Sequence, residues 1–556
     1  MSRLAAMKLP PLENLRQVVQ FLDPRIGVRL AQAGALGPKR AVAAAGSAPW
    51  LLGRGPSLGI LSQINAVADG GKPAIHDRNG TLTWREVDAR ANRLAGALCA
   101  QGLGRGDVLA TLLRNGREQV EAILAAQKIG VAVAPLNTWA KARELEAVME
   151  RTSPAFMIFD PRHFDQAKGA IGKTPTVPVG APYEDLLAGH APLPPVPLTL
   201  RRAEPRIIIH TSGTTGKPKA AARSAASAGV RSLIGLLGVV PFRSSDVIVC
   251  PAPLFHSFGS LSLSVMLLLG GTVVLPEKFD PDEALALIEE HRASAVSLVP
   301  VMVRRILDLP RSVRTRRELS SLRIVLTSGS VLSPDARKQA AKLFGDVLYD
   351  LYGSTEAGWV AIAGPEDMAA DPRTLGKPVP GVEVAIFGDD GERRETGEKG
   401  TLHVRSDAVF EGYASGEDVA EREGFLDIGD IGWLDDEGRL FVQGRSDDMV
   451  VVGGENVYPI EIEETIEGIE GVRGVAVVGV PDDEYGHVLA AFVEGKVDPE
   501  RIKAACRKEL ASFKVPKIVE VVDQLPRTDT GKVLKKDLTA SPEEDSKPRP
   551  RGRRSA

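Results

Sequence analysis

The chain of 556 residues is too long for one hydrophobic core, so we expect two or more domains. Hydrophobic residues make up 43% and charged residues 25%, as in an ordinary soluble globular protein, and the net charge of −3 gives no sign of a nucleic-acid binder. Cys99, Cys250 and Cys506 lie far apart without a C-x-x-C pair. This spacing argues against a zinc site or a disulfide framework and fits a reducing, cytoplasmic compartment.

Residues 1–60 form a basic, alanine-rich extension in which Glu13 and Asp23 are the only acids. Apolar residues recur at helical spacing near its start, at Leu12, Leu15, Val18, Val19 and Leu22. The simpler interpretation is a helical cap packed on the main domain. The alternative is a basic amphipathic segment that rests on anionic lipid, which would make the protein peripheral at the inner face of a membrane. The segment lacks the pattern of a signal peptide.

From about residue 61 the pattern alternates between helices and short buried strands. Thr83 and Glu86 can form a capping box, and apolar residues at helical spacing predict a helix from Thr83 to Leu98. Residues 261–275 predict a buried helix and then a strand, because serines and a glycine pair make this run too broken to span a bilayer. The expected strands are Val108–Leu113, Ala132–Pro135, Phe156–Phe159, Val247–Val249, Val296–Val299 and Ile324–Thr327. Strands separated by helical stretches indicate mixed α/β sheets with mainly parallel pairing.

Past Gly376 the segments become shorter and richer in Gly and Asp. We expect antiparallel hairpins at Val382–Phe387, Gly400–Val404 and Arg439–Val442. A small separate domain follows, with strands at Val475–Val480 and Leu489–Val493 and a helix at Arg501–Leu510. The predicted organisation is a basic extension (1–60), a large domain (61–444), a small domain (445–540) and a disordered, solvated tail (541–556).

The stretch IIIHTSGTTGKPK, residues 207–219, joins an apolar strand to a loop of small hydroxyl residues and glycines. It departs from a Walker A loop, because its glycines lie too close together and Pro218 follows Lys217. The backbone N–H groups of such a loop can still converge on an anion, while hydroxyls and lysines add donors and positive charge. A phosphate-binding loop is the leading interpretation, and an ordinary polar turn is the alternative.

The segment TSGTTGKPK also resembles the signature loop of the adenylate-forming enzymes, which include acyl-CoA synthetases, peptide-synthetase adenylation domains and luciferases. Further motifs follow in that family's order: DLYGSTE at 350–356, GD at 429–430, GRSDD at 444–448, GGENVYPIEIE at 453–463 and PRTDTGK at 526–532. The resemblance implies an α/β fold with a large N-terminal domain of mixed α/β sheets plus a distorted β-barrel, and a small mobile α+β C-terminal domain. It also implies ATP, Mg²⁺ and coenzyme A as ligands.

The resemblance assigns nucleotide contacts to several of these motifs. The β- and γ-phosphates of ATP would bind Thr211, Ser212, Gly213, Thr214, Thr215, Gly216, Lys217 and Lys219. Thr214 and Glu356 would hold Mg²⁺, which prefers oxygen ligands. The adenine slot would be framed by Gly329, Ser330 and Val331 and by the Tyr352 ring. The other residues of the second motif, Asp350, Leu351, Gly353, Ser354 and Thr355, would also bind the nucleotide. Tyr352 would stack on the base, with plain core packing as the alternative. Asp430 would accept hydrogen bonds from the ribose, assisted by Arg445.

The C-terminal motifs imply a moving small domain. Lys532 would swing over the site and bridge carboxylate and α-phosphate oxygens, for which a compact charge on a flexible stem is suited; a merely solvated lysine is the alternative. Asp447 would be the hinge of this rotation. Gly453 and Gly454 would permit close approach of the pantetheine arm. Asn456, in the same segment, stands where acetyl-CoA synthetases carry a phosphate-binding arginine, which weighs against acetate as the substrate.

His256 lies in FHSFG, residues 255–259, where the resemblance places the acyl pocket. It would orient the substrate carboxylate or gate the acyl tunnel, and a histidine hydrogen-bonded within its loop is the alternative. Apolar surroundings favour a medium- or long-chain fatty acid, with an aryl acid as the second choice. The role of His210 is left open.

The expected reaction is ATP-dependent, AMP-forming activation of this acid followed by transfer to CoA. Loading of a carrier protein is the alternative acceptor reaction, disfavoured because no insertion separates Glu356 from Gly376. A non-enzymatic, membrane-docked lipid-binding protein is a third hypothesis, and the intact set of Lys532, Glu356 and Asp430 argues against it. A homodimer is left open.

Overall fold

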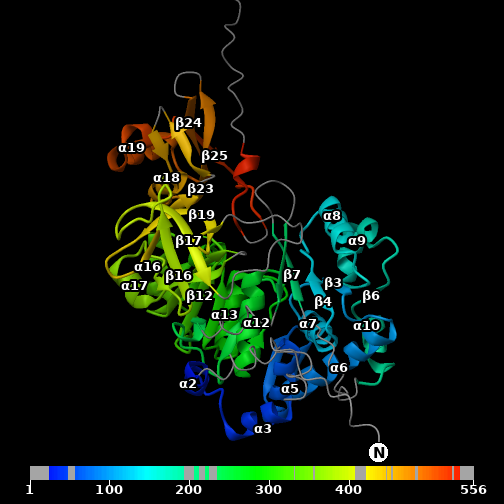
Figure 1. Cartoon of the computed structure of the whole chain (residues 1–556). Helices are drawn as coiled ribbons and strands as arrows, with labels where there is room; N and C mark the ends of the chain where they lie inside the picture. Colours follow the sequence, from blue (N-terminus) through cyan, green and yellow to red (C-terminus); the bar gives the residue numbers. More distant parts are fainter. Residues whose placement is uncertain are drawn as a thin grey trace, which may run out of the picture. The chain divides into compact units, whose positions relative to one another are not determined.

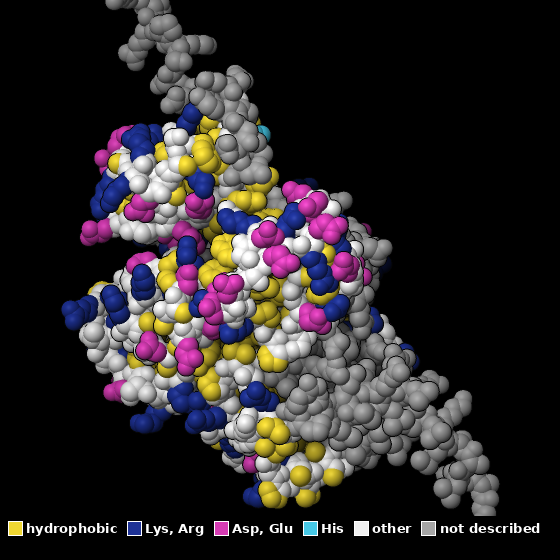
Figure 2. All heavy atoms as spheres, turned by 60° about the vertical axis from the view of Figure 1, so that its left-hand side comes forward, with side chains coloured by type: hydrophobic (Ala, Val, Ile, Leu, Met, Phe, Trp, Pro, Cys, Tyr) yellow, Lys and Arg dark blue, Asp and Glu magenta, His cyan; other side chains and the backbone are white. Residues whose placement is uncertain are grey.

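The computed structural model describes residues 24–47, 57–192, 206–211, 219–224, 235–330, 332–354, 357–406, 421–445, 448–452, 455–482, 486–528 and 531–538. The chain divides into two compact units (Figure 1). The larger unit comprises Met1–Leu332, Ala336–Ile428 and Trp433–Phe441, and the smaller comprises Ser333–Asp335, Gly429–Gly432 and Val442–Ala556. The face shown in Figure 2 carries Lys and Arg interspersed with Asp and Glu, in line with the small net charge. The domain boundaries named above stay predictions.

A six-stranded sheet in the larger unit has the strand order β6-β5-β3-β4-β7-β8. Its strands are β3 (Val108–Leu112), β4 (Ala132–Pro135), β5 (Phe156–Phe159), β6 (Thr176–Pro178), β7 (Arg206–Thr211) and β8 (Lys219–Ser224). The helices in the same part of the chain are α5 (Leu58–Asp69), α6 (Trp84–Ala100), α7 (Arg117–Ile129), α8 (Ala142–Thr152), α9 (Phe164–Ile171) and α10 (Ala181–Ala188). All pairings are parallel except that of β7 with β8.

Both faces of this sheet are covered by helices, as the continuous apolar strands require. Along β5, Phe156 and Ile158 join the core cluster that contains residues of α6, α7 and α10, whereas Met157 and Phe159 join a cluster with α8 and α9. This alternation follows from the two-residue period of a strand.

A nine-stranded sheet in the same unit has the order β15-β14-β13-β12-β11-β9-β10-β1-β2. Its strands are β1 (Pro73–Asp77), β2 (Gly80–Thr83), β9 (Val247–Val249), β10 (Thr272–Val274), β11 (Ala295–Leu298), β12 (Ile324–Ser328), β13 (Leu348–Ser354), β14 (Gly358–Ala363) and β15 (Lys377–Pro378). The helices around it are α12 (Ser257–Leu269), α13 (Pro281–Glu290), α14 (Pro300–Leu307), α15 (Arg311–Arg314), α16 (Pro334–Phe344) and α17 (Pro365–Ala370). Strands β9 to β13 pair in parallel, so their carboxyl ends share one edge of the sheet.

A five-stranded sheet follows, with β16 (Val382–Phe387), β17 (Gly400–Ser406), β18 (Glu421–Arg422), β19 (Phe425–Leu434) and β20 (Leu440–Arg445). The smaller unit then contains β21 (Val450–Val452), β22 (Glu455–Val457), α18 (Pro459–Glu467), β23 (Val472–Asp482), β24 (Gly486–Gly495), α19 (Pro499–Glu509) and β25 (Ile518–Val522). Helix α19 begins two residues before the predicted start, because Asp498 caps it by accepting from the Glu500 N–H at 3.1 Å and Pro499 occupies its first turn.

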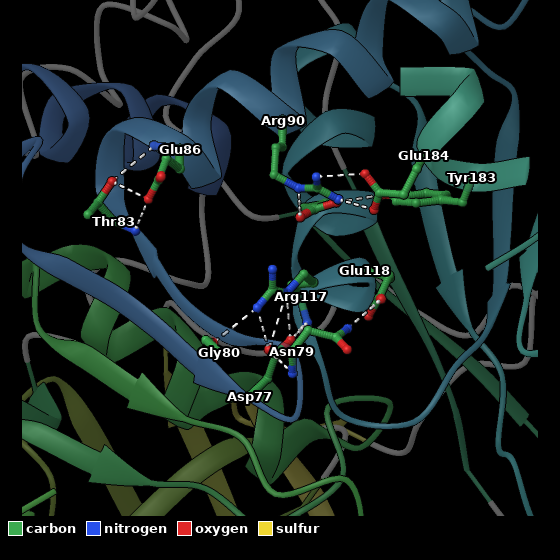
Figure 3. Close-up of polar contacts among 11 residues, drawn as sticks. Asp77, Asn79, Gly80, Thr83, Glu86, Arg90, Arg117, Glu118, Tyr183 and Glu184 are labelled. Carbon is green, nitrogen blue, oxygen red and sulfur yellow. Dashed lines mark hydrogen bonds and ion pairs between the residues drawn. The ribbon is translucent and has the colours of Figure 1, made fainter. Parts of the chain in front are cut away.

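The predicted capping box is confirmed at the start of α6 (Figure 3). Thr83 Oγ1 accepts from the Glu86 N–H at 3.4 Å, and Glu86 Oε2 accepts from the Thr83 N–H at 2.8 Å. One turn further, Arg90 donates to Glu121 on α7 at 2.6 Å and to Glu184 on α10 at 2.7 Å. These charge-assisted bonds tie three helices of one layer together.

The predicted fold class is confirmed. Mixed sheets flanked by helices precede a five-stranded β-sheet, in which β16–β17 and β18–β19 pair antiparallel, and a small α+β unit follows. The buried helix and strand expected at 261–275 are α12 and β10, which Gly270 separates in the left-handed conformation. Among the described residues, no helix is long and apolar enough to cross a membrane.

Candidate active site

The carboxyl edge of the nine-stranded sheet gathers segments that lie far apart in the sequence. Ser328, the last residue of β12, pairs with Leu351 of β13, so Gly329 and Ser330 follow directly beside Tyr352. The loop that leads to His256 follows β9 at the same edge. Ligands of open α/β sheets bind at such an edge. Two segments predicted to frame the adenine slot are therefore neighbours; Val331, Thr355 and Glu356 lie outside the described residues.

The carboxylate of Asp350 points into the protein core. It accepts from Thr327 Oγ1 at 2.6 Å and forms a buried ion pair with Arg337. Arg337 also donates to the carbonyl oxygens of Pro372 at 2.8 Å and Thr374 at 2.6 Å. This network holds the first half of β13, so the contribution of the Asp350 side chain is to position the strand. A direct nucleotide contact of Asp350 stays a prediction.

Gly353 is required by the close approach of β13 and β14. A Cβ atom at this position would collide with the carbonyl oxygen of Gly358 and the Cα of Trp359, at the point where the register of the two strands shifts. Ser354 Oγ accepts from the Ala357 N–H at 3.0 Å in the same turn. The glycine of the YGSTE motif thus has a structural role beside any contact with nucleotide.

His256 is the N-cap residue of α12, and its ring packs on Phe255 with 4.6 Å between centroids. Burial lowers the pKa of His256 to about 4, so the ring is neutral near pH 7. Its Nε2 atom is buried and meets no hydrogen-bonding partner among the described residues. The alternative is a histidine that is hydrogen-bonded within its loop, but Nε2 makes no such bond to the described residues. A buried ring nitrogen ordinarily has a partner, so this atom is available to a ligand.

Asn115, which the sequence analysis missed, holds the loop before His256 in place. Its Nδ2 donates to the carbonyl oxygens of Cys250 at 3.2 Å and Ala252 at 3.0 Å, and its Oδ1 accepts from the Leu254 N–H at 2.9 Å. Asn115 follows β3 of the six-stranded sheet, so one buried amide connects the two sheets at the loop after β9. No local pattern announces this role, because all three partners lie more than 130 residues away.

The predicted phosphate loop is bounded by two paired strands. Thr211 at the end of β7 pairs with Lys219 at the start of β8, so the two ends of the loop lie side by side. Ser212, Gly213, Thr214, Thr215, Gly216 and Lys217 lie outside the described residues, as do the side chains of His210, Thr211 and Lys219. Their contacts with phosphate and Mg²⁺ stay predictions.

The smaller unit carries the remaining predicted residues. Arg445 lies 3.7 Å from Asp430, and the Asp430 side chain keeps 15% of its surface accessible. Lys532 is exposed on a loop closed by a bond from its N–H to Thr528 Oγ1 at 3.1 Å. Asp447, Gly453, Gly454 and the side chain of Asn456 lie outside the described residues.

Comparison with known proteins decides the family. Residues 63–414 match the AMP-binding enzyme family, and residues 461–532 match the AMP-binding enzyme C-terminal domain. The chain belongs to the AMP-binding enzyme family. The adenylate-forming resemblance is confirmed, and with it an AMP-forming acid–thiol ligase at the level of the family.

Two relatives of the AMP-binding enzyme act on different acids. The chain is 33% identical to a feruloyl-CoA synthase of Amycolatopsis over 84% of its length and 95% of that protein. It is 32% identical to the long-chain-fatty-acid–CoA ligase FadD13 of Mycobacterium tuberculosis, over 82% and 92% of the two chains. Among solved structures, ATP-bound MatB from Rhodopseudomonas palustris superposes with a TM-score of 0.76 at 29% identity, covering 84% and 95% of the chains. These similarities do not distinguish fatty from aryl acids.

Proposed function

We propose that this AMP-binding enzyme is a CoA ligase that activates a medium- or long-chain fatty acid. The acid's carboxylate attacks the α-phosphorus of ATP and expels pyrophosphate, and the thiol of CoA then attacks the acyl-adenylate and releases AMP. The observation that carries the proposal is that Gly329, Ser330 and Tyr352 lie at the same sheet edge as the loop of His256, whose Nε2 atom has no hydrogen-bond partner among the described residues. No general base is required for the first step, because a carboxylate is already ionised near pH 7.

The chain's own groups suppress the repulsion between two anionic reactants. His256 is neutral at the working pH, so its ring can donate from Nε2 to a substrate carboxylate when the proton resides there. Lys532 would stabilise charge that develops between the carboxylate and the α-phosphate. Asp430 and Arg445 are a carboxylate–guanidinium pair suited to ribose hydroxyls. Thr214 and Glu356 would hold Mg²⁺, which when bound neutralises phosphate charge.

A fatty acid is favoured by the apolar surroundings of His256. Helix α12 follows it directly and is buried along almost its whole length, with Leu261, Leu263 and Leu267 in the core. An aryl acid is the second candidate, because aromatic rings lie near His256 and a feruloyl-CoA synthase is a relative. Phe255 packs on the His256 ring, and the Trp139 ring lies edge-on to Phe255 with 5.3 Å between the ring centroids.

CoA is the proposed acceptor because no insertion separates Glu356 from Gly376. From Ser354 the chain continues through β14 and α17 to β15 at Lys377. Loading of a carrier protein is the competing outcome of the test below. A homodimer and a cytoplasmic location stay predictions.

The test is pyrophosphate release with an acid panel, measured with and without CoA. The panel contains decanoate, oleate, ferulate, indoleacetate and acetate, and thioester is detected separately. We expect release with the fatty acids, thioester only when CoA is present, and little reaction with acetate. Release with ferulate alone would replace the fatty acid by an aryl acid, and acyl-adenylate that accumulates without thioester in the presence of CoA would indicate a carrier-protein acceptor. A folded protein without acid-dependent release would overturn the enzyme proposal.

A further inference from the structure

Two short helices before the large sheets present an apolar outer face. They are α2 (Pro24–Gln32) and α3 (Pro38–Gly46), and α3 packs beside α5. Among the described residues, eight large hydrophobic side chains stand exposed, and half of them lie between residues 28 and 67. They are Val28 on α2 at 54%, Leu36 between α2 and α3 at 51%, Val42 on α3 at 71% and Val67 on α5 at 65%. Figure 2 shows hydrophobic side chains with Lys and Arg beside them at the lower edge of the view, the level at which α3 lies in Figure 1. We call these four residues the N-terminal apolar face.

The helices that carry this face are firmly attached to the large unit. Arg40 is buried and donates from α3 to the side chain of Asn65 and to the carbonyl oxygen of Leu269 at the end of α12. The Ser244 N–H donates to the carbonyl oxygen of Ala33 at 2.7 Å, and Ala33 lies in the core. The inward residues are thus fully used in packing, and the outward valines are held in place rather than free to turn inward.

The segment that carries the face is basic in sequence. From residue 24 to residue 68 the sequence contains no Asp or Glu, whereas it contains five basic residues: Arg25, Arg29, Lys39, Arg40 and Arg54. Arg29 and Lys39 are exposed on the same two helices as Val28 and Val42. Asp69, at the end of α5, is the carboxylate whose charge acts on the buried Arg40. Exposed aliphatic residues fringed by cations complement a surface that is apolar below and anionic above.

We propose that the N-terminal apolar face docks the protein on an anionic lipid bilayer. Val28, Leu36, Val42 and Val67 would enter the boundary between headgroups and acyl chains, and Arg29 and Lys39 would contact lipid phosphates. The contact is peripheral, since none of the described helices is long and apolar enough to cross a bilayer. The proposal does not depend on the proposed substrate, because binding to vesicles is measured without ATP, acid or CoA.

The test is co-sedimentation of the full chain with vesicles of phosphatidylcholine alone and of phosphatidylcholine mixed with phosphatidylglycerol. We expect binding to the mixed vesicles that weakens as salt is raised. The double variant Val28→Asp/Val42→Asp should bind them at least about tenfold more weakly. Arg29→Glu/Lys39→Glu should lose the preference for the anionic vesicles. Val521→Asp, the same change at an exposed valine of β25, is the matched control and should bind like the parent.

Several results would overturn the proposal. One is a parent that does not sediment with the mixed vesicles at low salt, and another is a Val28→Asp/Val42→Asp variant that binds as the parent does. Loss of binding on removal of residues 1–23, with the double variant unaffected, would place the lipid contact in that segment. A parent dimer that the double variant converts to monomer, without any lipid binding, would make this face an interface between copies. Thermal unfolding of each variant shows that it is folded before binding is compared.

Discussion

Asn115→Ala tests whether one buried amide positions the loop that carries His256. The substitution removes three hydrogen bonds, two to carbonyl oxygens and one from the Leu254 N–H, which lies in a residue that is 1% exposed. At about 1 kcal/mol for each bond, with a further penalty for the stranded N–H, we expect about 3–4 kcal/mol of lost stability. An ångström-scale shift of the His256 ring should also lower kcat/KM about a hundredfold.

Two further variants make this prediction specific. Asn115→Asp keeps the shape and the acceptor but turns a carboxylate toward two carbonyl oxygens, so it should be at least as damaging as alanine. Asn92→Ala removes a bond of 2.9 Å to Asp88 on α6, away from the loop, and should leave kcat/KM unchanged. Urea unfolding and acid-dependent pyrophosphate release give the two readouts. Asn115→Ala protein with the parent's unfolding midpoint and activity would refute the reasoning.

Three other predictions concern single residues. Gly353→Ala should lower the free energy of unfolding in urea by about 1–3 kcal/mol, because a Cβ atom has no space beside Gly358. Gly46→Ala, where the space is open, is the control and should be neutral or stabilising; equal unfolding midpoints of the two variants would contradict this. The pKa of His256 lies below its ordinary value, so the unfolded chain protonates this ring more readily and the folded state loses stability as the pH falls from about 6.5 toward 4. His256→Phe should therefore flatten this part of the Tm–pH curve, and an unchanged slope would contradict the prediction. Lys532→Ala should lower acid-dependent pyrophosphate release at least about a hundredfold but spare thioester formation from supplied acyl-adenylate. Lys536→Ala, at another exposed lysine, is the control, and equal loss of both half-reactions in Lys532→Ala would contradict the domain rotation.

The fold was predictable where the deciding pattern is local. The capping box at Thr83, the alternation of helices and strands and the broken apolar run at 261–275 each express a rule that acts over a few residues. The family could be recognised from the order of its motifs along the sequence, because these motifs are visible without the folded structure.

The long-range features of the site could not be predicted from the sequence. The inward turn of the Asp350 carboxylate depends on Arg337 and Thr327, and the motif DLYGSTE contains neither residue. The role of Asn115 depends on bonds to a loop more than 130 residues away. The basic extension was expected to act as a cap or as a lipid contact; its described helices pack through Arg40 and Ala33, and the exposure of Val28 and Val42 became visible only in the folded chain.

The most direct test of the central claim follows the oxygen atoms of the acid. When the carboxylate attacks the α-phosphorus, one of its oxygens becomes the bridge of the acyl-adenylate and leaves with AMP after the thiol attacks. With an ¹⁸O-labelled fatty acid, ATP, Mg²⁺ and CoA, the account predicts one ¹⁸O atom in each AMP, unlabelled pyrophosphate and one acyl-CoA per AMP. Label in orthophosphate, or AMP that forms without label, would contradict it.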